Sequence, residues 1–316
     1  MRLFRSSPRI ALASFALVGV VALAGCSSSA GTAAGSSGAA SGSGASPIPV
    51  VASTDVWGDI AAQVGGDLVT VTSIIDDPDK DPHEYEADAQ NQLALSKASV
   101  VVENGGGYDD FVDTMLSSSN NSAAAVVNAA TISGYDLVPA DGEFNEHLWY
   151  DFPTVKKVVN EIAGSLSAAD PSAAATFSAN AAAYNAKLDT LIATEATLKS
   201  SFDGEGAAIT EPVPLYMLNA IGLVDKTPEK FSEAVENGTD VAPDLLAETV
   251  ALFSGDQVKV LAYNEQTSGA QTEAVLSAAK AGGVPVVPVT ETLPAGSSYL
   301  DWMSGNLDAL KSALSQ

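Results

Sequence analysis

Residues 171–202 read PSAAATFSANAAAYNAKLDTLIATEATLKSSF and contain no glycine and no proline after Pro171. Asp170 is suited to cap a helix, and Pro171 fits the first helical position. The larger apolar side chains recur at a spacing that places them on one side of such a helix. They are Phe177, Tyr184, Leu188, Leu191 and Leu198. The stretch predicts one helix of about 30 residues, roughly 45 Å long.

Short β-branched runs alternate with helical patterns on both sides of this helix. The predicted strands are Val50–Ala52, Val69–Ile75, Ser99–Val102, Ala124–Val127, Ala207–Thr210, Val258–Tyr263 and Val284–Val289. Such alternation is typical of parallel sheets flanked by helices. We therefore predict an α/β fold with two lobes joined by one long helix. The predicted boundaries are an N-terminal lobe over 47–169, the linking helix over 170–203 and a C-terminal lobe over 204–316.

The first 26 residues have the pattern of a leader rather than of a folded segment. Three arginines precede an apolar run, Ile10–Ala24, which is short for a membrane span. The run ends in Leu23-Ala24-Gly25-Cys26, which resembles a bacterial lipobox and implies lipidation of Cys26. Residues 27–46 are almost entirely Ser, Gly and Ala and predict a flexible tether. We expect a lipid-anchored protein on the extracellular face of the membrane.

Charge and cysteine content exclude several classes of partner and site. The net charge of −25 argues against nucleic acid and is compatible with cation binding, although most of the carboxylates are expected on a solvated surface. Cys26 is the single cysteine. The chain therefore has no disulfide within it, and a metal site in its folded part has no thiolate ligand.

The chain contains only two histidines, and each lies in an unusual context. His83 follows an acidic segment after the predicted strand Val69–Ile75, at the strand end where ligand sites of α/β folds gather. A charged surface loop is an equally good interpretation of this segment alone. A calcium loop is excluded because Pro82 occupies the position that requires glycine. His147 lies beside Trp149, where an isolated histidine is more often packed than a ligand.

Three segments resemble the zinc/manganese solute-binding proteins of ABC importers, the cluster A-I family. Asp81-Pro82-His83-Glu84-Tyr85-Glu86 is similar to the family motif Asp-Pro-His-Glu-Tyr-Glu-Pro, with Ala87 in place of the last proline. Residues 99–105, SVVVENG, resemble the family's hydrophobic run that ends in Asn-Gly. Residues 145–151, NEHLWYD, resemble its Pro-His-x-Trp-Leu-Asp-Pro segment, with Glu146 in place of the proline. The resemblance extends from Pro49 to the C-terminus.

The resemblance implies four ligands for one divalent ion in a cleft between the lobes. His83 and His147 correspond to the two ligands of the first lobe. Glu211, after the first strand of the second lobe, maps to the third ligand, and Glu291, after its last strand, maps to the fourth. Glu265 is predicted to support the ligands from a neighbouring strand end. Two imidazoles and two carboxylates suit Mn²⁺ or Zn²⁺, and this set is closer to the manganese type, although intrinsic affinity favours Zn²⁺.

The implied function is extracellular capture of Zn²⁺ or Mn²⁺ and delivery to an ABC importer permease by a monomer that is not an enzyme. One alternative is a metal-dependent hydrolase, but the sequence has no His-Glu-x-x-His and no spare histidine to act as a base. A surface adhesin is a second alternative, although the chain has no repeats. A third is a protein that binds a chelated metal or another small solute on a related two-lobed fold.

Overall fold

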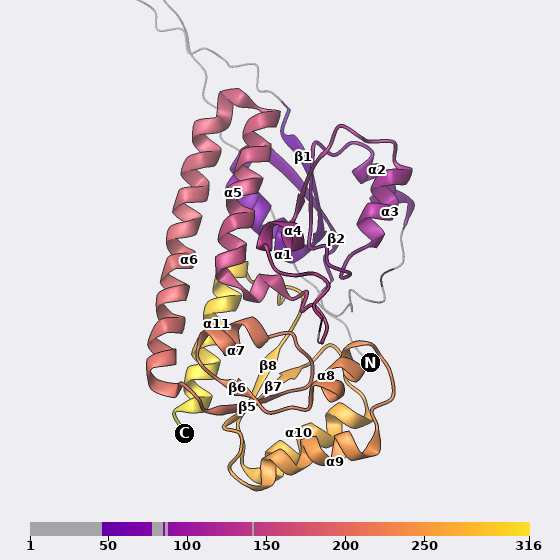
Figure 1. Ribbon diagram of the computed structural model, residues 1–316. Coiled ribbons are helices and arrows are strands. Elements are labelled where there is room, and N and C mark those ends of the chain that lie inside the picture. The colour runs from indigo at the N-terminus through magenta and orange to yellow at the C-terminus, as the bar shows by residue number, and fades with distance from the viewer. Residues whose placement is uncertain (1–45, 78–84, 86–87, 141) are drawn as a thin grey trace, which may run out of the picture. The chain divides into compact units, whose positions relative to one another are not determined.

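The alternation of β-branched and helical runs produces two parallel sheets. The computed structural model describes residues 46–77, 85, 88–140 and 142–316. Within these residues, the strands form two four-stranded sheets, each covered by helices on its two faces (Figure 1). This arrangement confirms the predicted two-lobed α/β fold.

The first sheet has the order β2-β1-β3-β4, and all its strands are parallel. The strands are β1 (Ile48–Thr54), β2 (Val69–Ile75), β3 (Val100–Glu103) and β4 (Ala125–Asn128). Its helices and 3₁₀ turns are α1 (Asp55–Gly65), η1 (Gly66–Leu68), α2 (Ala89–Leu95), α3 (Phe111–Ser118), α4 (Ala129–Ser133), η3 (Leu148–Tyr150) and α5 (Phe152–Ala169). Val50 packs with the core on the side of α1 and α5, whereas Val51 packs with α2 and α3. Both faces are buried, as parallel sheets require.

The second sheet repeats this order as β6-β5-β7-β8. The strands are β5 (Gly206–Ile209), β6 (Val224–Asp225), β7 (Val260–Asn264) and β8 (Val286–Val289). Its helices are α7 (Leu215–Ala220), α8 (Glu229–Glu236), α9 (Pro243–Ala251) with the turn η5 (Leu252–Ser254), α10 (Ala270–Gly282) and α11 (Tyr299–Leu314). Phe231 of α8 and Val275 of α10 pack with Leu261 on one face. Trp302 and Met303 of α11 belong to the core on the other face.

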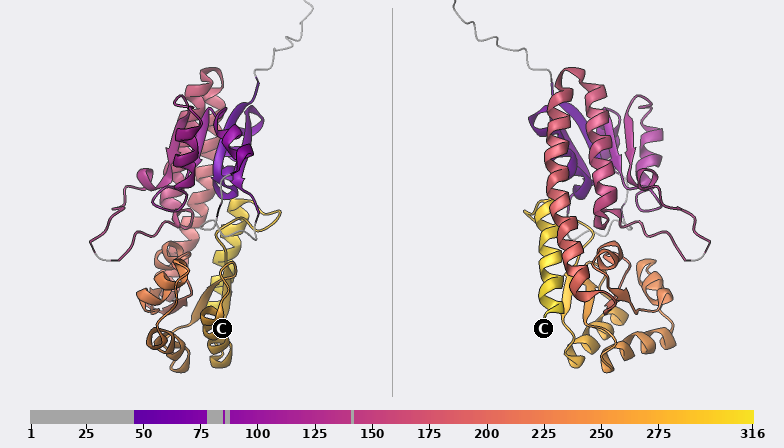
Figure 2. Two further views of the ribbon diagram at one scale, coloured as in Figure 1. Left: turned by 90° about the vertical axis from the view of Figure 1, so that its right-hand side faces the viewer. Right: turned by 60° about the vertical axis from the view of Figure 1, so that its left-hand side comes forward.

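The predicted linking helix is α6 (Ala174–Phe202), preceded by the turn η4 (Pro171–Ala173). Asp170 caps this turn, since its carboxylate accepts a hydrogen bond from the amide of Ser172. All five apolar residues of the predicted stripe are buried, which confirms the orientation of the helix. Helix α6 lies beside α5 in the first lobe and beside α11 in the second (Figure 2).

The two lobes share one hydrophobic core and several hydrogen bonds. The core cluster that contains Val50 of β1 also contains Phe177 of α6 and Met303 of α11. The amide of Tyr299 donates to Asp59 of α1 over 3.0 Å, and the Tyr299 hydroxyl donates to the carbonyl of Trp149 over 2.5 Å. The lobes are therefore joined by packed elements along α6 and α11.

None of the helices among the described residues has the length and apolar character needed to cross a bilayer.

Candidate metal centre

Glu211 and Glu291 follow two strands of the second sheet, and Asn264 ends the strand between them. Glu211 comes two residues after β5, Asn264 is the last residue of β7, and Glu291 comes two residues after β8. These strands are parallel neighbours, so their carboxyl ends meet at one edge of the sheet. Both glutamates are buried, with 2% and 1% of their surface exposed. Two carboxylates at this depth require compensating partners.

Glu291 is held by residues from both lobes. Asn264 Nδ2 donates to its Oε1 over 3.0 Å, and the Tyr108 hydroxyl donates to its Oε2 over 3.4 Å. The Glu291 amide donates to Gln266 Oε1 over 2.5 Å. These bonds fix the position of the carboxylate before any ion binds.

Glu211 carries a strongly perturbed carboxyl group. Burial raises its pKa to about 8, a hydrogen bond from Thr267 lowers it, and the nearby charges of Glu236 and Glu291 raise it. Thr267 Oγ1 donates to Glu211 Oε2. The mutual repulsion shows that the three carboxylates share one environment, and a cation placed there would relieve it.

His147 enters this environment from the first lobe, just before η3, and is completely buried. Its Nδ1 lies 2.8 Å from Asn145 Oδ1. Asn145 Nδ2 donates to the carbonyl of Pro212 over 3.1 Å, so the amide oxygen is the atom that faces the imidazole. A carbonyl oxygen only accepts, and Nδ1 must therefore carry a proton. In the neutral ring this leaves the Nε2 lone pair for a metal ion.

Nε2 of His147 faces two carboxylates. It lies 3.4 Å from Glu236 Oε1 and 3.9 Å from Glu291 Oε2. Glu236 is the last residue of α8, and 9% of its side chain is exposed. The arrangement combines an imidazole of the first lobe with carboxylates of the second.

The end of β3 supports the loop that carries His147. Asn104 Nδ2 donates to the carbonyl of Glu146 over 2.9 Å, and the Asp109 carboxylate accepts from the amides of Asn104 and Gly105. Gly105 has a φ of 71°, and a Cβ there would lie 2.3 Å from Asn128 Nδ2. The segment 99–105 thus needs its Asn-Gly pair to turn away from the strand and hold the histidine loop.

The structure brings together three of the predicted site residues, His147, Glu211 and Glu291. His83 and the lipidation candidate Cys26 lie outside the described residues. Glu265 follows β7 and is exposed, whereas its neighbours Asn264 and Gln266 contact Glu291. Among the residues described, no group of three or more His, Cys, Asp or Glu side chains is spaced to hold a metal ion.

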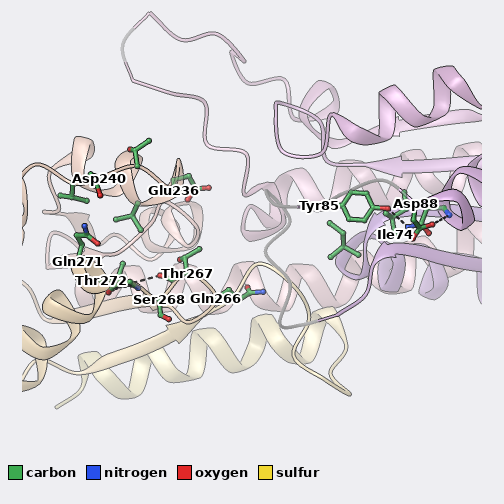
Figure 3. A pocket seen from close by; sticks show the side chains of 17 residues that line it. Ile74, Tyr85, Asp88, Glu236, Asp240, Gln266, Thr267, Ser268, Gln271 and Thr272 are labelled. Atoms are coloured by element: carbon green, nitrogen blue, oxygen red, sulfur yellow. Dashed lines mark hydrogen bonds between the residues drawn. The ribbon is translucent and has the colours of Figure 1, made fainter.

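Two cavities adjoin these side chains. One has a volume of about 800 Å³ and is lined by Glu236 and Thr267 on one side and by Tyr85 and Asp88 on the other (Figure 3). The other, of about 860 Å³, is lined by residues of the 137–146 loop, α7 and α8 and also includes Glu236. Glu236 thus borders both cavities.

Sequence reasoning missed four residues of this centre: Tyr108, Asn145, Asn264 and Glu236. The position of Asn145, two residues before a candidate ligand, was a usable signal, since asparagine bonds readily to groups two residues further on. Asn264 ends a strand beside two others that carry candidate ligands. Glu236 lies in an acidic stretch with no distinguishing spacing.

Two α/β lobes place an imidazole of the first opposite buried carboxylates of the second. A family model described as zinc-uptake complex component A, periplasmic (ZnuA), matches residues 50–313. The chain belongs to this family.

Individual relatives agree with the family match. The chain is 31% identical to the manganese-binding lipoprotein MntA of Halalkalibacterium halodurans over 43% of this chain and 45% of the relative. It spans about half the length of the MntA proteins it matches. It is 23% identical to the metal ABC transporter substrate-binding lipoprotein SloC of Streptococcus mutans, over 85% of this chain and 90% of that one. The solved structure of the periplasmic zinc-binding protein TroA of Treponema pallidum has the same fold, with a TM-score of 0.72 and 21% identity, and covers 85% of this chain and 99% of its own.

Proposed function

We propose that this protein captures one divalent transition metal ion between its lobes and delivers it to an ABC-type importer. The observation that carries the proposal is the position of His147 Nε2 opposite the buried carboxylate of Glu291. The lone pair of a neutral imidazole and a carboxylate repel each other, and either a bound metal ion or a proton on Nε2 relieves that repulsion. The names of the relatives, one manganese-binding and one a metal ABC transporter substrate-binding protein, support the same function.

The proposed ligands are His83, His147, Glu211 and Glu291. Two imidazoles and two carboxylates form a set without sulfur, which fits Mn²⁺ or Zn²⁺. Two carboxylates also neutralise one divalent ion. A metal ion would draw Glu211 and His147 toward one another. Mn²⁺ is the proposed cargo because the ligand set is closer to the manganese type, and Zn²⁺, which intrinsic affinity favours, is its strongest competitor.

The proposed cellular setting follows from the leader and from the relatives. A lipid on Cys26 and the tether over 27–46 would hold a monomer at the extracellular face of the membrane, where the importer permease is its partner. MntA and SloC are both named lipoproteins, which supports this arrangement. A single acyl chain binds membranes weakly, so stable attachment requires more than one.

The family match favours capture over hydrolysis or adhesion. A catalytic metal site keeps one coordination position open for water and needs a group that accepts its proton. Here His147 is fully buried, and both of its ring nitrogens face polar groups of the centre.

His147→Ala tests the proposal. The variant should lose tight binding of one Mn²⁺ or Zn²⁺ per chain in calorimetry, because the site loses one of its two proposed imidazole ligands. An unchanged melting temperature without metal would show that the fold is intact. The matched control is Lys157→Ala, which removes an exposed side chain of the first lobe whose one bond among the described residues goes to the carbonyl of Ser133. Unchanged stoichiometry and affinity in His147→Ala would refute the site.

A further inference from the structure

Among the described residues, Glu236 is the carboxylate nearest to His147 Nε2, and the family resemblance does not account for it. Its Oε1 lies 3.4 Å from Nε2, closer than the 3.9 Å of Glu291 Oε2. It is carried by α8, whereas the expected second-lobe ligands follow β5 and β8. The centre therefore receives a carboxylate from a third element of the second lobe.

The distance of 3.4 Å between His147 Nε2 and Glu236 Oε1 can be compared with the spacing of two atoms that bind the same metal ion. Two ligand atoms that each lie about 2.1 to 2.2 Å from one ion are about 3.0 to 3.6 Å apart, for angles between the octahedral and the tetrahedral value. Two groups in direct hydrogen-bond contact would normally be closer, at about 2.7 to 2.9 Å for a charged pair. The distance between Nε2 and Oε1 thus matches a pair that shares an ion.

The surroundings of Glu236 also favour contact with an ion. Only 9% of its side chain is exposed, and it lies within 4 Å of the fully buried imidazole of His147. It borders both cavities next to the centre. In Figure 3 the side chain lies on the same side of the first cavity as Thr267, which bonds to Glu211.

We propose that Glu236 is an additional metal ligand and that it shifts the selectivity of the centre toward Mn²⁺. This inference rests on the proposed function. A third carboxylate makes the donor set harder and raises the coordination number. Mn²⁺ prefers oxygen ligands, often six, whereas Zn²⁺ is satisfied by four ligands. The extra carboxylate therefore stabilises bound Mn²⁺ more than bound Zn²⁺.

The test compares Glu236→Gln with Glu229→Gln by calorimetry with Mn²⁺ and with Zn²⁺. Glu229 lies two turns earlier on the same helix, is exposed, and loses the same charge without touching His147. We expect Glu236→Gln to weaken Mn²⁺ binding by about tenfold or more and Zn²⁺ binding by less, so that the Mn²⁺/Zn²⁺ preference falls. Glu229→Gln should change both affinities less than about twofold. The visible spectrum of Co²⁺ in the site should change in Glu236→Gln alone, because it reports the ligands directly.

Three results would overturn the proposal: a Mn²⁺ affinity of Glu236→Gln within about twofold of the wild type, equal losses in Glu236→Gln and Glu229→Gln, or an unchanged Co²⁺ spectrum. Failure of the proposed function would look different, because the wild type itself would then bind neither ion. If Glu236→Gln melts at a much lower temperature without metal, Glu236→Asp is used instead to distinguish a ligand role from a long-range charge effect. It keeps the charge but is one methylene shorter, so a ligand role predicts loss of Mn²⁺ affinity and a long-range charge effect predicts none.

Discussion

Asn145 decides which nitrogen of His147 is available to a metal ion. Its Oδ1 faces Nδ1 over 2.8 Å, while its Nδ2 donates to Pro212 in the second lobe over 3.1 Å. The hydroxyl of Tyr216 donates to the Asn145 carbonyl over 2.7 Å. One neutral side chain thus orients the imidazole and ties its loop to the segment that carries Glu211.

We expect Asn145→Ala to weaken metal binding by about 10- to 100-fold, the usual effect of removing the group that orients a histidine ligand. The imidazole would lose its fixed tautomer, and part of the population would present a protonated Nε2. Calorimetry with Mn²⁺ and Zn²⁺ measures the loss. Asn160→Ala, which removes an exposed asparagine on α5, is the control. Equal affinities in the two variants would mean that Asn145 does not orient the ligand.

The sequence predicted the charged members of the centre better than its neutral ones. His147 stands in a segment that resembles a family motif and Glu211 follows a predicted strand, whereas Asn145 and Tyr108 are polar residues of common types. Glu265 shows why a sequence pattern does not place a side chain to within one residue at the end of a strand. Successive side chains at a strand end point in opposite directions, so Asn264 faces Glu291 while the next residue, Glu265, is exposed.

Helix α8 and strand β6 were not predicted from the sequence. The omission of α8 matters most, because this helix carries Glu236. Strand β6 has two residues, too few to show a period of two. Helix α8 buries only Phe231 and Ser232 and is otherwise acidic and half-exposed, so its pattern resembles a solvated turn. Long periodic elements were predicted well: the bounds of β2 are those expected, and α6 differs only in its first turn, which is 3₁₀.

Helix α6 also carries a buried acid within its apolar stripe. Glu195 is 4% exposed, and its Oε1 has no hydrogen-bond partner among the described residues. Burial, followed by the charge of Asp151, raises its pKa to about 8 from 4.5. Between these values the folded chain holds a proton that the unfolded chain has released. Raising the pH through this window therefore favours unfolding.

We expect Glu195→Gln to be more stable than the wild type at about pH 8.5, by about 2 kcal/mol, because the glutamine never ionises. Near pH 5 the two proteins should differ little, since Glu195 is then protonated in the folded state. Urea unfolding at both pH values measures this difference. Other raised carboxyls, such as Glu103, cancel in the comparison because both proteins contain them. A stability difference that does not depend on pH would contradict the assignment.

At the scale of the whole molecule, the centre lies where the two lobes already touch. Tyr108 of the first lobe donates to Glu291 of the second, and Tyr150 donates to the carbonyl of Thr290 over 2.9 Å. The core that runs along α6 and α11 contains residues of both lobes. A metal ion would add one more bond between lobes that are already packed, so we expect a small closure rather than a wide hinge motion.

An ion that binds only the folded state must also stabilise it. At a free concentration of about 100 times Kd the gain is about 2.7 kcal/mol, which raises the melting temperature by roughly 5–10 °C for a protein of this size. Mn²⁺ and Zn²⁺ should both show this shift, and His147→Ala should abolish it. Because the chain carries a net charge of −25, any divalent ion screens its surface. Mg²⁺ at the same concentration is therefore the control, since it avoids imidazole ligands. An equal shift with Mg²⁺, or one that persists in His147→Ala, would assign the stabilisation to the acidic surface and not to the centre between the lobes.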